Sequence, residues 1–348
     1  MVLIPPDTKE KEAGYTPASP TAPEQAPPPY TPSETYASSI STRFPRSEPA
    51  SASSQLTSTP NTPWEKGIIS KTAVSRTGPL NIQGSVESRS SVTLSESIHV
   101  TGHVESSSFI HLKDNVVIEG KLDSSSEVKA RDGVRIDGKI DARGKVELCS
   151  GEEVVSVGGK IDARGAVTLD GSSFLGKQKQ ADESDGKNFG VRIGGKVDGG
   201  GAVDVRGVVS IDGKIDAGGR ISLGGLVYVG GSVDAGGGVK LSGIEGGGVY
   251  VIGKVESRGN VEMRGPVRID GDLGSSGNLR LDSEKEQMIL GGKVSARGNA
   301  NVKGIVNIGK SFTVKGNLAL DGHLHVDGGL AVSGTISQTP GSTISGGP

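Results

Sequence analysis

Residues 138–144 read Gly-Lys-Ile-Asp-Ala-Arg-Gly, and the same seven residues return at 159–165. Shortened variants of this phrase stand at 195–198, 213–216 and 253–256. The apolar residue of the phrase recurs every 18 residues over most of the chain, as from Leu122 to Ile140. Four of the intervals are longer. Its positions are Val86, Val104, Leu122, Ile140, Ile161, Val197, Ile215, Val233, Val255, Leu273, Val294, Phe312 and Leu330. A fixed period of this length indicates a solenoid in which each repeat packs on its neighbours.

Each 18-residue unit divides into three segments of six residues. In each segment two apolar or small residues stand at positions i and i+2, and a turn residue, often glycine, follows. The i, i+2 spacing places both side chains on one side of a short strand, and glycine turns a corner at little steric cost. The sequence therefore predicts an all-β fold: a triangular, single-stranded parallel β-helix of about 18 residues per coil, with about 13 coils.

The faces of the predicted prism are named here by the strands of one coil. Face A holds residues 140–142, face B holds 146–148 and face C holds 134–136. The four longer intervals come from insertions that all fall at the predicted corner between faces B and C. This fits a prism, in which extra residues can bulge from one edge without disturbing the stack. The insertions follow Leu148, Leu169, Leu241 and Leu281.

Composition divides the chain into three parts. Residues 1–63 are rich in Pro, Ser, Thr and Ala and show no strand or helix period, so we expect a disordered tail. Residues 64–337 carry the repeat, and residues 338–348 are expected to form a second, short disordered tail. Glycine accounts for 56 of 348 residues and aromatic residues for only 3%. The chain therefore has too little bulky material for a broad globular core.

Charge and hydropathy exclude several classes of partner. The net charge of −2 provides no basic surface for nucleic acid. No apolar run is long enough to span a membrane, so we predict no transmembrane segment, and only a weak membrane-surface contact through residues 1–4 stays open. The single cysteine, Cys149, excludes an internal disulfide and fits a reducing compartment. We therefore expect a cytoplasmic protein.

Face A is expected to present a column of lysines beside a column of carboxylates on its outer side. Stacked carboxylates resemble a glycosidase pair, but the pair recurs in almost every coil and lysines flank it. We interpret it as a solvated charge ladder. The five histidines lack convergent metal-ligand spacing, and the triple-glycine runs lack the Gly-Lys-Ser/Thr of a phosphate loop. We therefore predict no catalytic, cofactor or metal site, and no enzyme.

The Gly-Lys-Ile-Asp-Ala-x-Gly phrase on a three-by-six period resembles the bactofilins, a family of polymer-forming cytoskeletal proteins. The resemblance covers roughly residues 79–337. It implies a right-handed β-helix that joins end to end into filaments without nucleotide, in the cytoplasm and as part of a cytoskeleton. The body is longer than the family pattern, and the proline-rich tail suggests a fungal member.

The ends of the predicted solenoid favour self-association independently of that resemblance. Neither end shows an amphipathic helix that could cover it, so we expect the terminal coils to expose apolar side chains and unpaired strand edges. The predicted polymer ends are Ile68, Val74, Leu80 and Ile82 in the first coil and Leu324, Val326, Leu330, Val332 and Ile336 in the last. The first functional hypothesis is a structural homopolymer, a filament or scaffold with no cofactor.

Two alternatives stay open. Pro27, Pro28 and Tyr30 match the Pro-Pro-x-Tyr ligand of WW domains, which bind polyproline II segments in an aromatic groove. This motif predicts a monomeric β-helical adaptor whose tail recruits a WW-domain partner. The weaker alternative is a β-helix enzyme, such as a polysaccharide lyase or a hexapeptide acyltransferase. The repeat carries neither the small residue of acyltransferase hexads nor the isolated charged cluster of a lyase.

Overall fold

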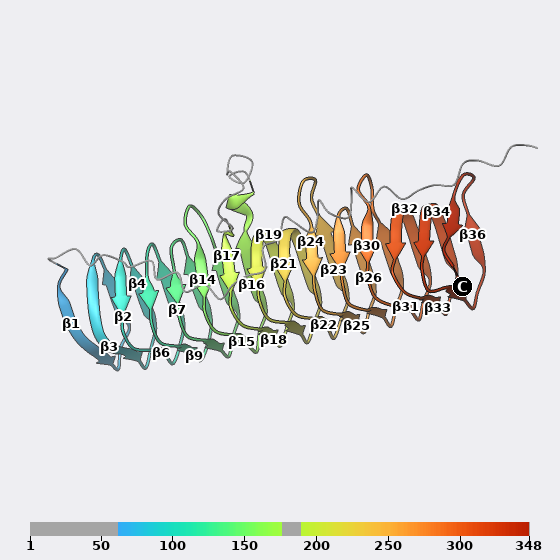
Figure 1. The fold of residues 1–348 in the computed structure, drawn as a ribbon. Coiled ribbons are helices and arrows are strands. Elements are labelled where there is room, and N and C mark those ends of the chain that lie inside the picture. The colour runs from blue at the N-terminus through green and yellow to red at the C-terminus, as the bar shows by residue number, and fades with distance from the viewer. Residues whose placement is uncertain (1–61, 176–188, 348) are drawn as a thin grey trace, which may run out of the picture. The chain divides into compact units, whose positions relative to one another are not determined.

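The computed structural model describes residues 62–175 and 189–347. These residues form a β-solenoid of about 15 turns, in which parallel strands pair with the strands one coil before and one coil after. Figure 1 shows the coils stacked in chain order, with loops projecting along one edge. The predicted all-β, parallel, coiled architecture is therefore confirmed.

Three faces account for the strands. Face A consists of β6 (Val104–Ser106), β9 (Leu122–Ser124), β12 (Ile140–Ala142), β15 (Ile161–Ala163), β18 (Val197–Gly199), β20 (Ile215–Ala217), β22 (Val233–Ala235), β25 (Val255–Ser257), β28 (Leu273–Ser275), β31 (Val294–Ala296), β33 (Phe312–Val314) and β35 (Leu330–Val332). Face B consists of β2 (Val74–Thr77), β4 (Val92–Ser95), β7 (Ile110–Lys113), β10 (Val128–Arg131), β13 (Val146–Cys149), β16 (Val167–Gly171), β23 (Val239–Gly243), β26 (Val261–Arg264), β29 (Leu279–Asp282) and β36 (Ile336–Gln338).

Face C and the strands that turn a corner complete the coils. Face C consists of β5 (Ile98–Val100), β8 (Val117–Ile118), β11 (Arg135–Ile136), β14 (Val155–Val157), β17 (Val191–Ile193), β24 (Val249–Val251), β27 (Val267–Ile269), β30 (Met288–Leu290) and β37 (Thr343–Ser345). Longer strands run from face C to face A as β1 (Trp64–Ser70) and β3 (Leu80–Ser88), and from face B to face C as β19 (Val203–Ile211), β21 (Ile221–Val229), β32 (Ala300–Ile308) and β34 (Leu318–Val326).

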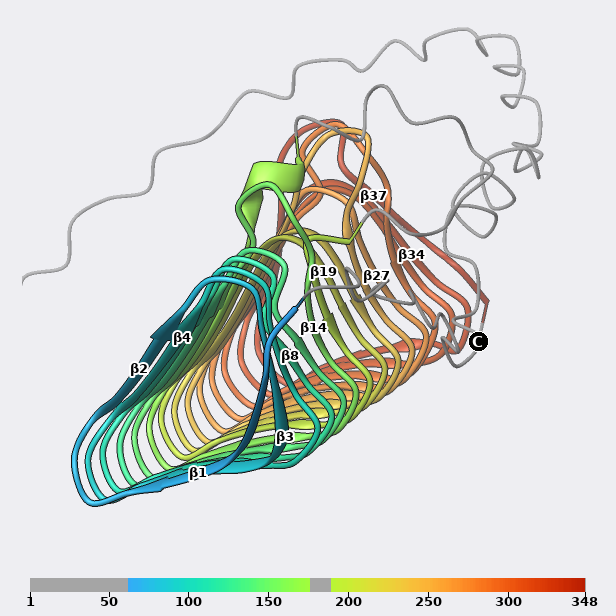
Figure 2. The same cartoon turned by 90° about the vertical axis from the view of Figure 1, so that its left-hand side faces the viewer.

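The coil is three-sided and right-handed. Figure 2 looks along the stack from the first coil, and face A lies along the bottom, face B on the left and face C on the right. The chain passes from A to B to C and runs clockwise as it recedes from the viewer. A clockwise path that recedes defines a right-handed solenoid.

The core is a set of aliphatic ladders inside the three faces. In β12 the side chains of Ile140 and Ala142 are buried while Asp141 lies on the outer side. Ile140 pairs in register with Leu122 below and Ile161 above. The same alternation repeats from coil to coil, so at most inward positions an apolar or small residue stacks on another. Fully burying one such side chain stabilises the fold by roughly 1.5–3 kcal/mol.

The first residue of the repeated phrase is glycine because it stacks on the glycine of the coil before, as Gly138 does on Gly120. Gly138 lies at the corner between faces C and A, and a Cβ placed on it would be 2.5 Å from the backbone oxygen of Gly120 in the coil before. The amide of Gly138 donates a hydrogen bond to that same oxygen, at 3.2 Å. Only glycine allows the backbones of neighbouring coils to approach this closely at the corner.

The predicted position of the insertions is confirmed, because all four leave the stack between a face B strand and the next face C strand. The insertions after Leu148, Leu241 and Leu281 form loops along the upper edge in Figure 1. Uninterrupted turns at this corner use left-handed residues such as Asp114 and Asn115, with φ of 57° and 63°. The insertion after Leu169 begins with a single 3₁₀ turn, η1 (Ser172–Phe174), whose Phe174 is buried.

The stack extends further than the sequence predicted at its C-terminal end. Strand β37 pairs in parallel with β34, with Ile344 opposite Leu324. Residues 343–345 therefore belong to face C and not to a disordered tail, because an extra turn at residues 339–342 carries the chain back to the sheet. The described stack has about 15 turns, compared with the 13 coils predicted from the sequence.

Helical structure in residues 62–175 and 189–347 is confined to η1. Over these residues, no helix has the length and apolar character needed to cross a membrane.

The glycine column gives a stability test. Gly138→Ala should lower the free energy of unfolding by about 1–3 kcal/mol, because the new methyl group overlaps the backbone of Gly120. The matched control is Gly274→Ala on face A, where the nearest atoms to a Cβ are 3.8 Å away. That variant should stay within about 0.5 kcal/mol of the wild type. Equal denaturant midpoints for the two variants would contradict the close-approach argument.

Candidate assembly surfaces at the two ends of the solenoid

The first coil departs from the ladder at two inward positions. Strand β1 pairs with β3 so that Glu65 lies opposite the buried Ile82, and β2 pairs with β4 so that Arg76 lies opposite the buried Leu94. Both charged side chains are half-buried, whereas their outward neighbours in the strands are exposed. The two positions that hold aliphatic residues in the second coil therefore hold opposite charges in the first.

These two charges form an ion pair across the inside of the prism. Arg76 Nε donates to Glu65 Oε2 at 3.2 Å, and the side chains are 39% and 42% exposed. Glu65 comes from face C and Arg76 from face B, so the pair joins two faces at the N-terminal end of the core. The N-terminal end consequently presents a polar surface beside the half-buried Ile68.

Three residues predicted to be exposed at this end are buried. Val74, Leu80 and Ile82 have exposed fractions of 4%, 7% and 0%. Strand β1 lies on β3 at the N-terminal end of the stack, with Glu65 opposite Ile82. Trp64 is 61% exposed and pairs with the outward position of Asn81, so it does not lie over the core.

The C-terminal end has a different character. The inward positions of its last coil hold the aliphatic residues Leu330, Val332, Ile336 and Ile344. Ile336 is 48% exposed, and the other three are half-buried against the core. The two remaining inward positions of the last coil hold Gln338, which pairs with Leu320, and Gly346, which stands two residues after Ile344. Neither position carries a charge.

Two further predicted end residues lie inside the stack at this end. Leu324 and Val326 are 1% and 2% exposed, because β37 forms one more strand beyond them. Histidines on β34 hold that strand through side-chain hydrogen bonds. His323 Nδ1 lies 2.7 Å from Thr343 Oγ1, and His325 Nδ1 lies 3.0 Å from Ser345 Oγ.

Both ends also leave strand edges without a partner among the described residues. Strand β1 pairs with β3, and β2 pairs with β4, on one side each. At the other end β35, β36 and β37 likewise pair on one side, with β33 and β34. A row of unpaired backbone N–H and C=O groups is a template for another strand.

The predicted charge ladder is present on the outer side of face A. A lysine Nζ donates to the carboxylate two residues on in successive coils, as in Lys160 to Asp162 at 2.8 Å. The hydrogen bond from Lys160 lowers the pKa of Asp162 below its usual 3.8. A general acid needs a raised pKa, so this carboxylate is poorly suited to glycosidase chemistry. The other pairs are Lys121–Asp123, Lys139–Asp141, Lys196–Asp198, Lys214–Asp216 and Lys254–Glu256.

Two of the histidines lie beside carboxylates at the surface, and the cysteine is half-buried. His99 contacts Glu119 at 2.9 Å, and His111 contacts Glu127 at 3.2 Å. Within residues 62–175 and 189–347, no three His, Cys, Asp or Glu side chains gather in a way that could hold a metal ion. Cys149 is half-buried, and burial raises the pKa of its thiol.

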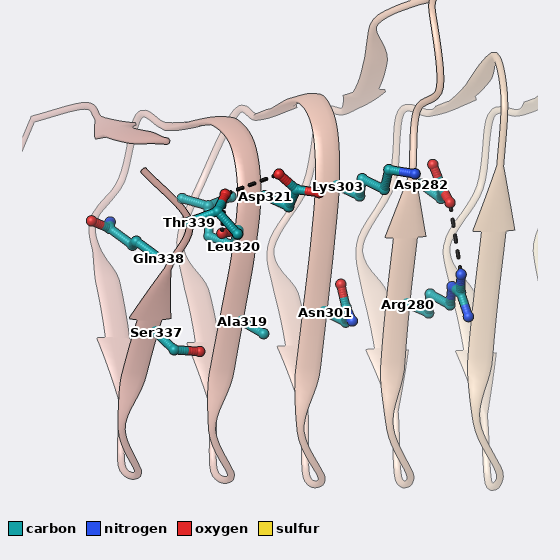
Figure 3. Close-up of a pocket in the computed structure, with 10 residues that line it drawn as sticks. All are labelled: Arg280, Asp282, Asn301, Lys303, Ala319, Leu320, Asp321, Ser337, Gln338 and Thr339. Carbon is teal, nitrogen blue, oxygen red and sulfur yellow. Dashed lines mark hydrogen bonds and ion pairs between the residues drawn. The ribbon is translucent and has the colours of Figure 1, made fainter. Parts of the chain in front are cut away.

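A shallow groove of about 340 Å³ lies on face B beside the C-terminal end (Figure 3). Two small residues, Ala319 and Ser337, are among those that line it. Its charges are mixed, because Arg280 approaches Asp282 at 3.8 Å, and Thr339 Oγ1 donates to Asp321 at 2.9 Å. The lining residues are Arg280, Asp282, Asn301, Lys303, Ala319, Leu320, Asp321, Ser337, Gln338 and Thr339. The groove favours neither an anion nor a cation, and it adjoins the last face B strand.

The WW-ligand residues Pro27, Pro28 and Tyr30, and the apolar start at residues 1–4, lie outside the described residues. The structure therefore describes neither the predicted WW contact nor the membrane-surface contact.

Comparison with known proteins adds no family to this picture. No protein-family model, curated protein or solved structure matches the chain.

The charge ladder gives a pH-dependent test. Lys160→Met should raise the pKa of Asp162 toward 3.8, because the hydrogen bond from Lys160 is the largest cause of its lowering. A lowered carboxyl pKa contributes stability above pH 3.8, and this contribution is lost as the pH falls through the folded-state pKa. Carbon-detected NMR titration of the Asp162 carboxyl measures the shift. An unchanged pKa in the variant would contradict the assigned contact.

Proposed function

We propose that this protein is a non-enzymatic structural element that assembles with itself, end to end, through its β-solenoid into filaments or scaffolds. The observation that carries the proposal is the C-terminal end, where aliphatic ladders of the core reach the surface beside free strand edges. In a solenoid, such an end is stabilised by another repeat, and the nearest available source of a matching repeat is a second copy. The proposal requires no nucleotide, metal or cofactor.

The repeated phrase supports the same proposal, because the bactofilins it resembles are cytoskeletal polymers. On this basis we place the protein in the cytoplasm, as part of a cytoskeletal structure. The charged outer side of face A also fits, since charges along a sheet discourage sideways pairing and direct association to the ends.

The proposal is tested by the size of the full-length protein without nucleotide. Sedimentation and negative-stain microscopy at rising concentration should show end-to-end assemblies of two or more copies. Monomers at every concentration reached would contradict it.

Ile336→Asp should weaken this assembly at least tenfold in dissociation constant, because docking would bury an unpaired carboxylate. The matched control is Ile305→Asp, the same substitution on a side chain of similar exposure, 44%, at the edge between faces B and C. The control should assemble like the wild type. Equal weakening by both variants would show that the end is not the contact.

The second candidate is the WW-domain adaptor suggested by Pro27, Pro28 and Tyr30. It predicts that Tyr30→Ala abolishes binding to a WW domain in calorimetry. Binding that is lost in this variant, combined with a monomeric full-length protein, would favour the adaptor over the polymer.

A further inference from the structure

The described solenoid begins and ends on the same face, face C. The chain passes through the faces in the order A, B, C, and the last coil ends on face C with β37. A continuing coil would next place a strand on face A and then one on face B. The first described strand, β1, instead begins on face C at residues 64–66, before it turns onto face A at Ile68.

This arrangement leaves a gap when two copies join head to tail with each face continuing its own column. Residues 64–66 of one copy can pair with β37 of the other, because both are free edges on face C. Strands β35 and β36 then lie two coil spacings from the nearest strands of the next copy, about 10 Å instead of about 5 Å. The junction therefore lacks one face A strand and one face B strand.

Residues 50–58 precede the described range, which starts at residue 62, and their sequence continues the repeat. Ala50 stands one repeat before Ile68, an inward residue of face A. Leu56 stands one repeat before Val74, an inward residue of face B. The sequence just before β1 therefore has the spacing of one face A strand followed by one face B strand.

Other residues of this segment fit the same two faces. The second inward position on face A would hold Ala52, and the structure places small residues such as Ala142 at that position. Pro60 and Asn61 follow the face B segment, and both residue types favour turns. They stand where the chain would pass from face B to face C, the corner that takes the longer turns elsewhere in the stack.

We propose that residues 50–52 and 56–58 supply the two missing strands, and that the assembly is a head-to-tail filament with this segment as its joining coil. The inference rests on the proposed end-to-end association, and the partner is a second copy of this chain. The segment gains a packed neighbour on both sides only at such a junction, so the joining coil forms together with the contact. A head-to-tail contact is open, and it therefore allows copies to be added one after another.

The joining coil continues the aliphatic column of face B across the junction. Leu56 lies between Ile336 of the preceding copy and Val74 of its own copy. Ile336 is 48% exposed at the free end, whereas Val74 is already 4% exposed. Docking thus buries the most exposed aliphatic residue of the C-terminal end against another aliphatic side chain.

The Glu65–Arg76 ion pair is compatible with this junction. Ser58 stands one repeat before Arg76, so its hydroxyl group lies next to the guanidinium in the same column. Gly346, which has no side chain, is the inward residue that Glu65 meets on face C. The pair therefore keeps a polar neighbour when the junction removes its water, which offsets part of the desolvation.

A charge placed inside the joining coil tests its packing. In the full-length chain, Leu56→Asp should raise the dissociation constant of assembly at least tenfold, because the junction would bury an unpaired carboxylate. The matched control is Thr57→Asp, which puts the same charge at the outward position of the same strand and should assemble like the wild type. Both residues precede the described solenoid, so neither substitution changes its core. Sedimentation at rising concentration measures both variants.

Cysteine pairs test the register of the junction. Thr57 should lie beside Ser337, the outward residue of β36, in the preceding copy. Thr57→Cys with Ser337→Cys should therefore give a ladder of disulfide-linked oligomers on mild oxidation, since neighbouring strands are about 4.8 Å apart. The control is Thr57→Cys with Ala319→Cys, because Ala319 lies one coil further away, at about 10 Å, and should not link. Cys149 is common to both variants.

The remaining outcomes separate the joining coil from the proposed function. A wild type that assembles, with Leu56→Asp and Thr57→Asp assembling equally well, would overturn the joining coil and leave end-to-end association intact. Assembly of the cysteine variants without linkage through Ser337→Cys, or with equal linkage through Ala319→Cys, would overturn the register. Wild-type monomers at every concentration would overturn the proposed function itself, and the joining coil with it.

Discussion

The whole structure depends on the stacking of identical inward positions from one coil to the next. A single coil orders about 18 residues and buries too few side chains to offset the entropy that this costs, roughly 1.5 kcal/mol per residue. Stability therefore arises between coils, where Ile140 contacts the ladder positions of Leu122 and Ile161. An internal coil has two such neighbours and a terminal coil has one. The ends are thus the places where the fold itself leaves a contact unmade.

The corner glycines and the outer charges follow from the same constraint. The stack requires backbones of neighbouring coils to pass within hydrogen-bonding distance at every corner, and Gly138 meets that requirement where any Cβ would overlap Gly120. The outer side is free of packing demands, so lysine and carboxylate alternate there and neutralise each other, as Lys160 and Asp162 do. The repeated phrase therefore joins a steric requirement, a core residue and a surface pair in a few residues.

Periodicity alone was sufficient to predict the fold and the edge that carries the insertions. The regular spacing of the phrase placed Ile140 beneath Ile161, and the structure pairs them in register. The first coil was harder, because β1 has an irregular register between Lys66 and Ile68. Counting back one repeat from Ile82 gives Trp64 and not Glu65, so the inward charge was missed.

The regular spacing identifies one of the other end residues, Arg76, and misses another, Ile344. Arg76 lies one full repeat before Leu94, and that spacing was available to identify it as an inward charge. At the other end, Ile344 follows Leu324 by slightly more than one repeat, because an extra turn precedes β37. Composition made that segment look like a tail. The position of the end surfaces and the charge of Arg76 were thus predictable from the spacing, whereas Glu65 and Ile344 depended on local irregularities of register.

Hydrogen–deuterium exchange measured against protein concentration tests the central claim most directly. If the unmade contact at the C-terminal end drives assembly, amides in β35, β36 and β37 should exchange more slowly as concentration rises. Amides in an internal strand such as β20 should be unaffected, since both of their neighbouring coils are always present. Exchange at β35 to β37 that stays the same from dilute to concentrated protein would contradict the account.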